Sequence, residues 1–77
     1  MLYNSGRLSQ KEVYDILKEL GGIASAQQIS MRAKEKFPEF TLHLYVVNRL
    51  KKLQKNGFVE RVIMDGKVFW KIVAEFQ

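Results

Sequence analysis

Apolar residues recur at helical spacing in three successive segments, and at a spacing of two near the end of the chain. The first segment begins at Ser9, and Glu12 follows three residues later. This separation is typical of a capping box, in which each side chain accepts a hydrogen bond from the other residue's backbone N–H. The segment stops at Gly21-Gly22, since glycine readily takes the backbone conformation that ends a helix. We therefore predict a helix over 9–20.

A second capping box, Ser25 with Gln28, opens the next helical segment. Proline disfavours helix in the residue before it, so Pro38 ends this helix near Phe37. The pair Ile23-Ala24 between the first two helices is too short for more than a bridging strand.

The third helical segment spans 41–56, with Thr41 as its N-cap and Gly57 as its terminating glycine. One face carries the apolar stripe Val46, Val47, Leu50 and Leu53. The other side carries Tyr45, Asn48, Arg49, Lys51, Lys52 and Lys55, which include four cations and no acid. A helix of this kind buries one side and offers the other to a polyanion.

After the third helix the pattern changes to the alternation of strands. Segments 58–64 and 67–73 are rich in β-branched and aromatic residues, and Asp65-Gly66 between them is a strong two-residue hairpin signal. The resulting pairs are Met64–Lys67, Ile63–Val68, Val62–Phe69, Arg61–Trp70, Glu60–Lys71 and Val59–Ile72.

The two faces of this hairpin differ in polarity. Glu60 opposite Lys71 indicates an exposed face, so Val59, Trp70 and Ile72 are expected to face the core. The pair Val62–Phe69 then forms an apolar patch on the exposed face. Such a patch indicates a dimer surface or cover by the N-terminal segment.

Composition narrows the class of protein. A length of 77 residues with 47% hydrophobic residues favours one folded domain, 1–77, with 1–7 as a flexible N-terminal segment and 74–77 as a tail. The chain has no cysteine, which excludes disulfides and thiolate metal sites. No apolar run approaches the roughly 20 residues that span a bilayer, so no membrane partner is expected. The net charge of +5 favours an anionic partner.

The segments Leu50-Lys-Lys-Leu53-Gln-Lys-Asn-Gly57-Phe58-Val59-Glu60-Arg61 and Phe69-Trp70-Lys71-Ile72 carry a resemblance to a known family. The first resembles the end of a recognition helix followed by the first wing strand of winged helix-turn-helix proteins. The second resembles their return strand. The likeness extends over 9–73, and the compact chain is similar to small regulators of archaea and of their viruses and plasmids. It implies an α+β fold of three helices with a C-terminal two-stranded wing and a short bridging strand near Ile23.

The resemblance implies that the third helix enters the major groove of DNA and that the hairpin lies along the backbone or minor groove. The base-reading candidates are then Thr41, Leu44, Tyr45, Asn48 and Arg49. The phosphate-contacting candidates are Lys51, Lys52 and Lys55, with Arg61 and Lys67 on the wing. Asp65 at the wing tip departs from this pattern, since a phosphate would repel it.

Several of these residues have a second interpretation. Asn48 and Arg49 suit adenine and guanine, but each can equally bind a phosphate. Tyr45 either contacts DNA or packs against the second helix. Leu44 either meets a thymine methyl group or a partner subunit, or is buried against Phe40.

Catalysis and cofactor binding find no support in the residues. The single histidine, His43, has no second histidine or cysteine to share a metal with and is expected to be structural. The acids Glu12, Asp15 and Glu19 have the spacing of capping and surface charges. We expect no enzyme activity, no cofactor and no small-molecule ligand.

The sequence thus predicts a sequence-specific, double-stranded DNA-binding transcription regulator of the cytoplasm, associated with the nucleoid. A homodimer on a two-fold symmetric site is expected, because one small domain covers few base pairs. Its candidate contacts are Leu2, Tyr3, Phe69 and Phe76. The alternatives are a protein-binding winged helix that docks an acidic partner, and a binder of structured RNA.

Overall fold

The computed structural model describes residues 9–37 and 43–76, and for residues 43 and 44 it describes the backbone alone. In chain order the elements are α1 (Gln10–Glu19), β1 (Ile23–Ala24), α2 (Ala26–Lys36), α3 (His43–Lys55), β2 (Val59–Met64) and β3 (Lys67–Ile72). The strands form an antiparallel sheet in the order β1-β3-β2. These three helices and three strands make an α+β fold that is compatible with a winged-helix-like arrangement.

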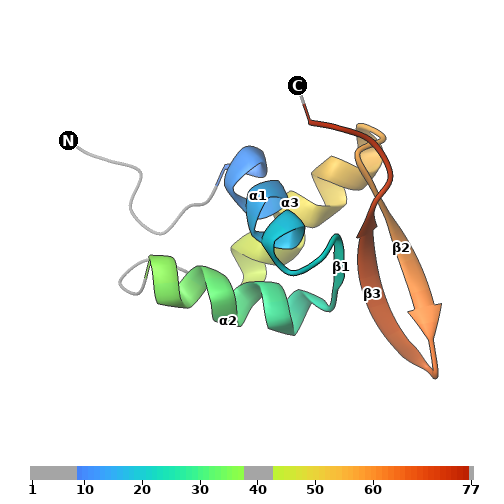
Figure 1. Ribbon diagram of the computed structural model, residues 1–77, viewed down its shortest axis with the longest axis horizontal. Helices are drawn as coiled ribbons and strands as arrows, with labels where there is room; N and C mark the ends of the chain where they lie inside the picture. Colours follow the sequence, from blue (N-terminus) through green and yellow to red (C-terminus); the bar gives the residue numbers. More distant parts are fainter. Residues whose placement is uncertain (1–8, 38–42, 77) are drawn as a thin grey trace.

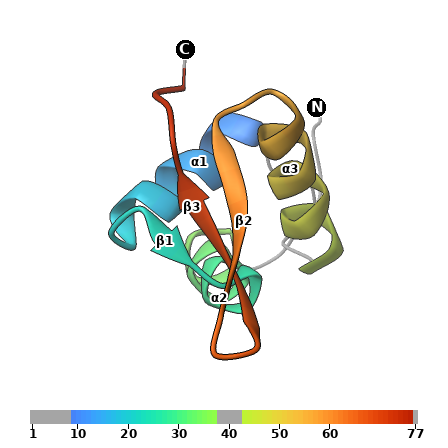
Figure 2. The ribbon, with the colours of Figure 1, turned by 90° about the vertical axis from the view of Figure 1, so that its right-hand side faces the viewer.

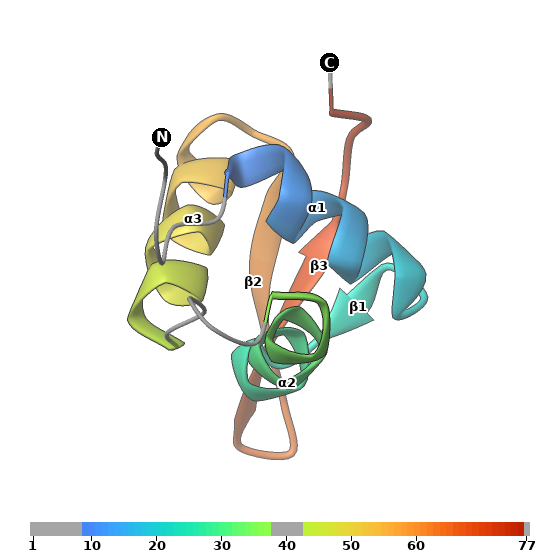
Figure 3. The ribbon, with the colours of Figure 1, turned by 90° about the vertical axis from the view of Figure 1, so that its left-hand side faces the viewer.

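The helices form one layer and the sheet the other. Figures 1 and 3 show α1, α2 and α3 on the same side of the sheet, and Figure 2 shows the other side of the sheet with no helix in front of it. The closed end of the β2–β3 hairpin extends past the helices (Figures 1 and 2). None of the helices in the described ranges is long and apolar enough to cross a membrane.

Both predicted capping boxes are present. The Ser9 hydroxyl accepts from the Glu12 backbone N–H at 3.1 Å, and the Glu12 carboxylate accepts from the Ser9 N–H at 2.9 Å. Ser25 and Gln28 make the same pair of bonds at the start of α2. These local bonds satisfy backbone donors that have no partner inside the helix, which is why the two helices begin where predicted.

The end of α3 follows the predicted glycine. Gly57 has a φ of +86°, and beyond it the Phe58 N–H donates to the Leu53 carbonyl at 2.9 Å. This bond pattern turns the chain sharply from α3 into β2. The predicted N-cap, Thr41, lies outside the described residues.

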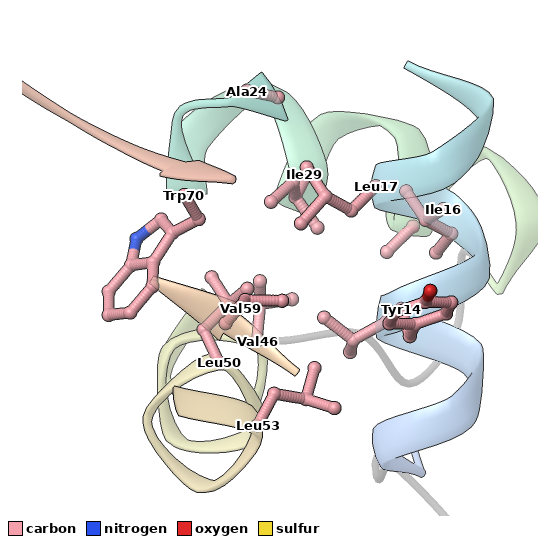
Figure 4. Close-up of a cluster of buried hydrophobic side chains, with 12 residues drawn as sticks. Tyr14, Ile16, Leu17, Ala24, Ile29, Val46, Leu50, Leu53, Val59 and Trp70 are labelled. Carbon is pink, nitrogen blue, oxygen red and sulfur yellow. The ribbon is translucent and has the colours of Figure 1, made fainter. Parts of the chain in front are cut away.

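The core is built from the helical stripes and the inner face of the sheet. Val46, Leu50 and Leu53 of α3 are fully buried and lie between α1 and the sheet (Figure 4). Trp70 of β3 is 5% exposed, which confirms its predicted place in the core. Val47, which the pattern also assigned to the buried face, is only half-buried. On an α-helix Val47 is rotated by about 100° from Val46 about the helix axis, so it lies at the margin of the buried stripe.

The hairpin has the predicted register at every pair from Val59–Ile72 to Met64–Lys67. Asp65 and Gly66 have φ of +52° and +74°, the positive values that a type I′ turn requires at both central residues. Glu60 and Lys71 are exposed, as expected for the outer face.

The outer face differs from prediction at the Val62–Phe69 pair. Both side chains are half-buried instead of forming a fully exposed patch. Cross-strand neighbours on one face of a sheet shield each other in this way.

The C-terminal segment packs on its own chain. The Phe76 ring lies 4.8 Å from that of Phe58 and 5.5 Å from that of Tyr14, measured between centroids. The Tyr14 hydroxyl donates to the Ala74 carbonyl at 2.9 Å. Phe76, expected at a dimer contact, is thus half-buried within the chain that carries it.

Candidate nucleic-acid interface

The exposed side of α3 is the surface on which the sequence-based site prediction depends. Asn48, Lys51 and Lys55 recur at i, i+3 and i+7, and all three are exposed. They lie opposite the stripe that Val46 and Leu50 bury. Packing therefore anchors α3 on one side and leaves a polar, basic strip on the other.

Three lysines of this helix have no acidic partner in the described part of the chain. The α3 segment contains no Asp or Glu. Lys51, Lys52 and Lys55 are exposed, and none of them takes part in an ion pair within residues 9–37 and 43–76. Exposed cations without acidic neighbours produce the positive potential that draws in a polyanion.

Two cations of α2 are, by contrast, paired with an acid of α1. Glu19 of α1 accepts from Arg32 Nε of α2 at 3.2 Å and also from the Lys36 ammonium. Arg32 reaches Glu35 as well, at 2.9 Å. The hydrogen bond from Lys36, followed by that from Arg32, lowers the pKa of the Glu19 carboxyl. The bonds to Glu35 and then Glu19 raise the pKa of Arg32.

Arg49 lies on a different flank of α3 from Asn48. It is half-buried and lines a hollow of about 600 Å³ between the start of α1 and α3, together with Lys11 and Lys52. Beside it the Asn56 amide donates to the Gln10 side-chain oxygen at 3.3 Å. Arg49 is thus grouped with two lysines, an arrangement that suits a phosphate more directly than a base edge.

The remaining predicted residues of α3 are less accessible or lie outside the description. Tyr45 is half-buried, on the same flank as Arg49. Thr41 is not among the described residues, and for His43 and Leu44 only the helical backbone is described.

The wing carries its predicted cations at the surface. Arg61 and Lys67 are both exposed, and Asp65 at the turn is exposed between them. The same end of the hairpin bears the exposed apolar side chains Ile63, Met64 and Val68. Its surface is therefore largely apolar and nearly neutral, unlike that of α3.

Lys11 is the one candidate that sequence reasoning missed. The sequence places it in a slightly acidic helix, and it does form an exposed pair with Asp15 at 3.4 Å. Only the packing of α1 against α3 brings it to the hollow shared with Arg49 and Lys52. No pattern within either segment predicts such a contact between residues far apart in the sequence.

The described residues show no arrangement for metal chemistry. Within 9–37 and 43–76, no three His, Cys, Asp or Glu side chains lie close enough to hold a metal ion. Searches against models of protein families, curated proteins and solved structures found no match to this chain.

Proposed function

We propose that this chain is a winged helix-turn-helix protein that binds double-stranded DNA and regulates transcription. In this proposal α3 enters the major groove and the β2–β3 hairpin lies beside it, along the backbone or the minor groove. One observation carries the proposal: the outward side of α3 presents Asn48 among the exposed Lys51, Lys52 and Lys55, which have no ion-pair partner within residues 9–37 and 43–76.

The geometry of α3 suits a groove. The major groove, roughly 12 Å wide, admits a single α-helix, and a helix anchored along one side presents its other side to the base edges. Asn48 can pair with adenine through two hydrogen bonds, while the flanking lysines neutralise phosphates on either strand. Affinity then depends on release of counterions and falls steeply with salt.

Recognition by one such helix covers few base pairs. We therefore include in the proposal a homodimer that reads a two-fold symmetric site, with half-sites about one helical turn apart. Each α3 would take one half-site.

The first experiment is a binding titration by fluorescence anisotropy with random-sequence duplex DNA, duplex RNA of the same sequence and poly-glutamate, at several salt concentrations. We expect duplex DNA to bind most tightly and its affinity to fall linearly with salt on logarithmic axes. Preference for poly-glutamate would favour a protein-docking winged helix, and preference for RNA would favour an RNA binder. Either result would overturn the proposal.

Selection from random duplexes then tests sequence specificity. We expect an enriched motif with two-fold symmetry. If the pool is bound but no sequence is enriched, α3 binds DNA phosphates without sequence specificity, and the proposed sequence-specific regulator is wrong.

A further inference from the structure

The closed end of the β2–β3 hairpin is unusually apolar for an exposed turn. Ile63 is 62% exposed, Met64 41% and Val68 38%. Because successive strand residues point to opposite faces, Ile63 and Val68 lie on one face of the hairpin and Met64 on the other. Apolar side chains exposed on both faces of one element mark a surface that contacts a partner.

Among the described residues, the same hairpin also has an edge with no partner strand. The sheet order β1-β3-β2 leaves β2 at its margin. The Phe58 carbonyl accepts from the Val73 N–H, so in the alternating antiparallel pattern the backbone groups of Arg61 and Ile63 point away from β3. Unpaired N–H and C=O groups in a row are a template for another strand.

We propose that two copies of this chain associate by antiparallel pairing of their β2 edges about a two-fold axis through Ile63. In this register Ile63 faces Ile63 of the second copy. Val62 faces Met64 of the second copy, and Arg61 faces Asp65 of the second copy. The two exposed Ile63–Val68 pairs then form one continuous apolar strip across four strands.

Charge selects this register over its neighbours. An axis through Arg61 would bring two guanidinium groups opposite each other, which is destabilising on one face of a sheet. An axis through Val62 would leave Arg61 opposite an isoleucine. The axis through Ile63 instead brings each Arg61 side chain near the turn residue Asp65 of the other copy, which places opposite charges together.

The β2 edge of the hairpin suits a second copy, because its exposed Ile63 and Met64 offer no group that binds phosphate. Lys67 lies on β3, away from that edge, and stays exposed for the DNA contact of the proposed function. The pairing involves β2 from Arg61 to the turn, and the closed end of the hairpin extends past the helices (Figures 1 and 2), so the bodies of the two copies lie on either side of the joined hairpins. The dimer of the proposed function rests on such an interface, but its existence can be tested without DNA.

Disulfide trapping tests the register directly, because the chain contains no cysteine. Directly opposed residues of a hydrogen-bonded antiparallel pair have Cα atoms about 5.5 Å apart, within the range that a disulfide spans. We expect Ile63→Cys to form a covalent dimer under mild oxidation more efficiently than Val62→Cys. Met31→Cys on α2 is the matched control, since Met31 is 64% exposed and Ile63 is 62% exposed. Equal trapping at Ile63 and Met31, or preferred trapping at Val62, would overturn the proposal.

A charge exchange provides a second test. Arg61→Glu and Asp65→Lys each place like charges across the interface, so each variant alone should be less dimeric than the unmodified chain in sedimentation equilibrium. An equimolar mixture restores both opposite-charge pairs, and we expect it to associate about tenfold more tightly than either variant alone. A mixture that associates no better than its components would refute the interface. If the unmodified chain is a monomer that still binds DNA, this inference and the proposed homodimer are refuted while DNA binding by α3 stands, whereas a dimer that does not bind DNA would refute the proposed function alone.

Discussion

Lysine and arginine side chains have opposite roles in two regions of the molecule: the contact between α1 and α2, called the seam below, and the outer strip of α3. At the seam, Glu19 accepts from both Arg32 and Lys36, so the charges are neutralised within the chain. On α3, Lys51 and Lys55 have no acidic partner in the described part of the molecule. The net charge of +5 does not distinguish these regions, whereas the placement of the acids does.

This difference shows that a basic residue indicates a polyanion site most directly when it has no acidic partner in its own chain. Paired surface cations contribute to the local fit between helices, and the benefit of each exposed pair is small. Unpaired cations on one strip repel one another, and a bound polyanion removes that repulsion. Five variants can break or sharpen this contrast, and they are taken from the largest expected effect to the smallest.

Leu50→Ala should have the largest effect, because Leu50 is fully buried at the centre of the stripe that anchors α3. Removing a buried leucine side chain costs about 2–5 kcal/mol of unfolding free energy, which is most of the stability of a small domain. Urea unfolding followed by circular dichroism measures the loss. Gln54→Ala is the matched control on the exposed surface of the same helix, with an expected change within about 0.5 kcal/mol. Equal effects at the two positions would mean that α3 is not anchored by this stripe.

Asn48→Ala should have the next largest effect, on sequence preference instead of stability. If its amide reads a base, the variant loses about 1–3 kcal/mol on the selected site and much less on random DNA. Arg49→Ala separates the two roles of the helix, because Arg49 lies in the hollow with Lys11 and Lys52. We expect Arg49→Ala to weaken all sequences alike. The opposite outcome, with Arg49 governing preference and Asn48 neutral, would place the base-reading side on the flank next to α1.

The parts of the fold predicted from sequence are those governed by neighbouring residues. The capping boxes of Ser9 and Ser25 close over three residues, and Asp65-Gly66 determines the hairpin register through its own backbone. The position of Phe76 was not predictable, because it depends on Tyr14, a residue 62 positions earlier in the chain. Contacts of that kind arise only once α1 and the C-terminal segment have packed together.

The candidate site divides in the same way. Helical periodicity alone placed Asn48, Lys51 and Lys55 on an exposed strip, and they are exposed. It treated Arg49 as another outward residue, because a helical wheel contains no information about α1. The half-buried position of Arg49 and its grouping with Lys11 follow from the packing of two helices.

Lys51→Ala should have a moderate effect that is the same for every DNA sequence. Loss of one phosphate contact lowers the slope of log affinity against log salt by about one unit. The matched control is Lys36→Ala, which removes the same type of side chain at a position where the lysine is already paired with Glu19. We expect Lys36→Ala to leave the slope nearly unchanged. If both variants lower the slope equally, internal pairing does not decide which lysines meet DNA, and the contrast between the two regions fails.

Glu19→Gln should have the smallest effect, and its dependence on pH identifies its cause. In the folded chain Lys36 and Arg32 hold the pKa of Glu19 below its ordinary value of 4.5, while the unfolded chain keeps that ordinary value. The carboxylate therefore stabilises the fold fully above pH 4.5, and this contribution is lost as the pH falls through the lowered pKa. The unfolding free energies of the original chain and the variant should differ slightly at neutral pH and converge as the pH falls through the lowered pKa of Glu19, with the neutral difference also shrinking in high salt. A difference that stays constant from neutral to acidic pH would mean that Glu19 acts through packing, and the seam would then no longer be an example of charges neutralised within the chain.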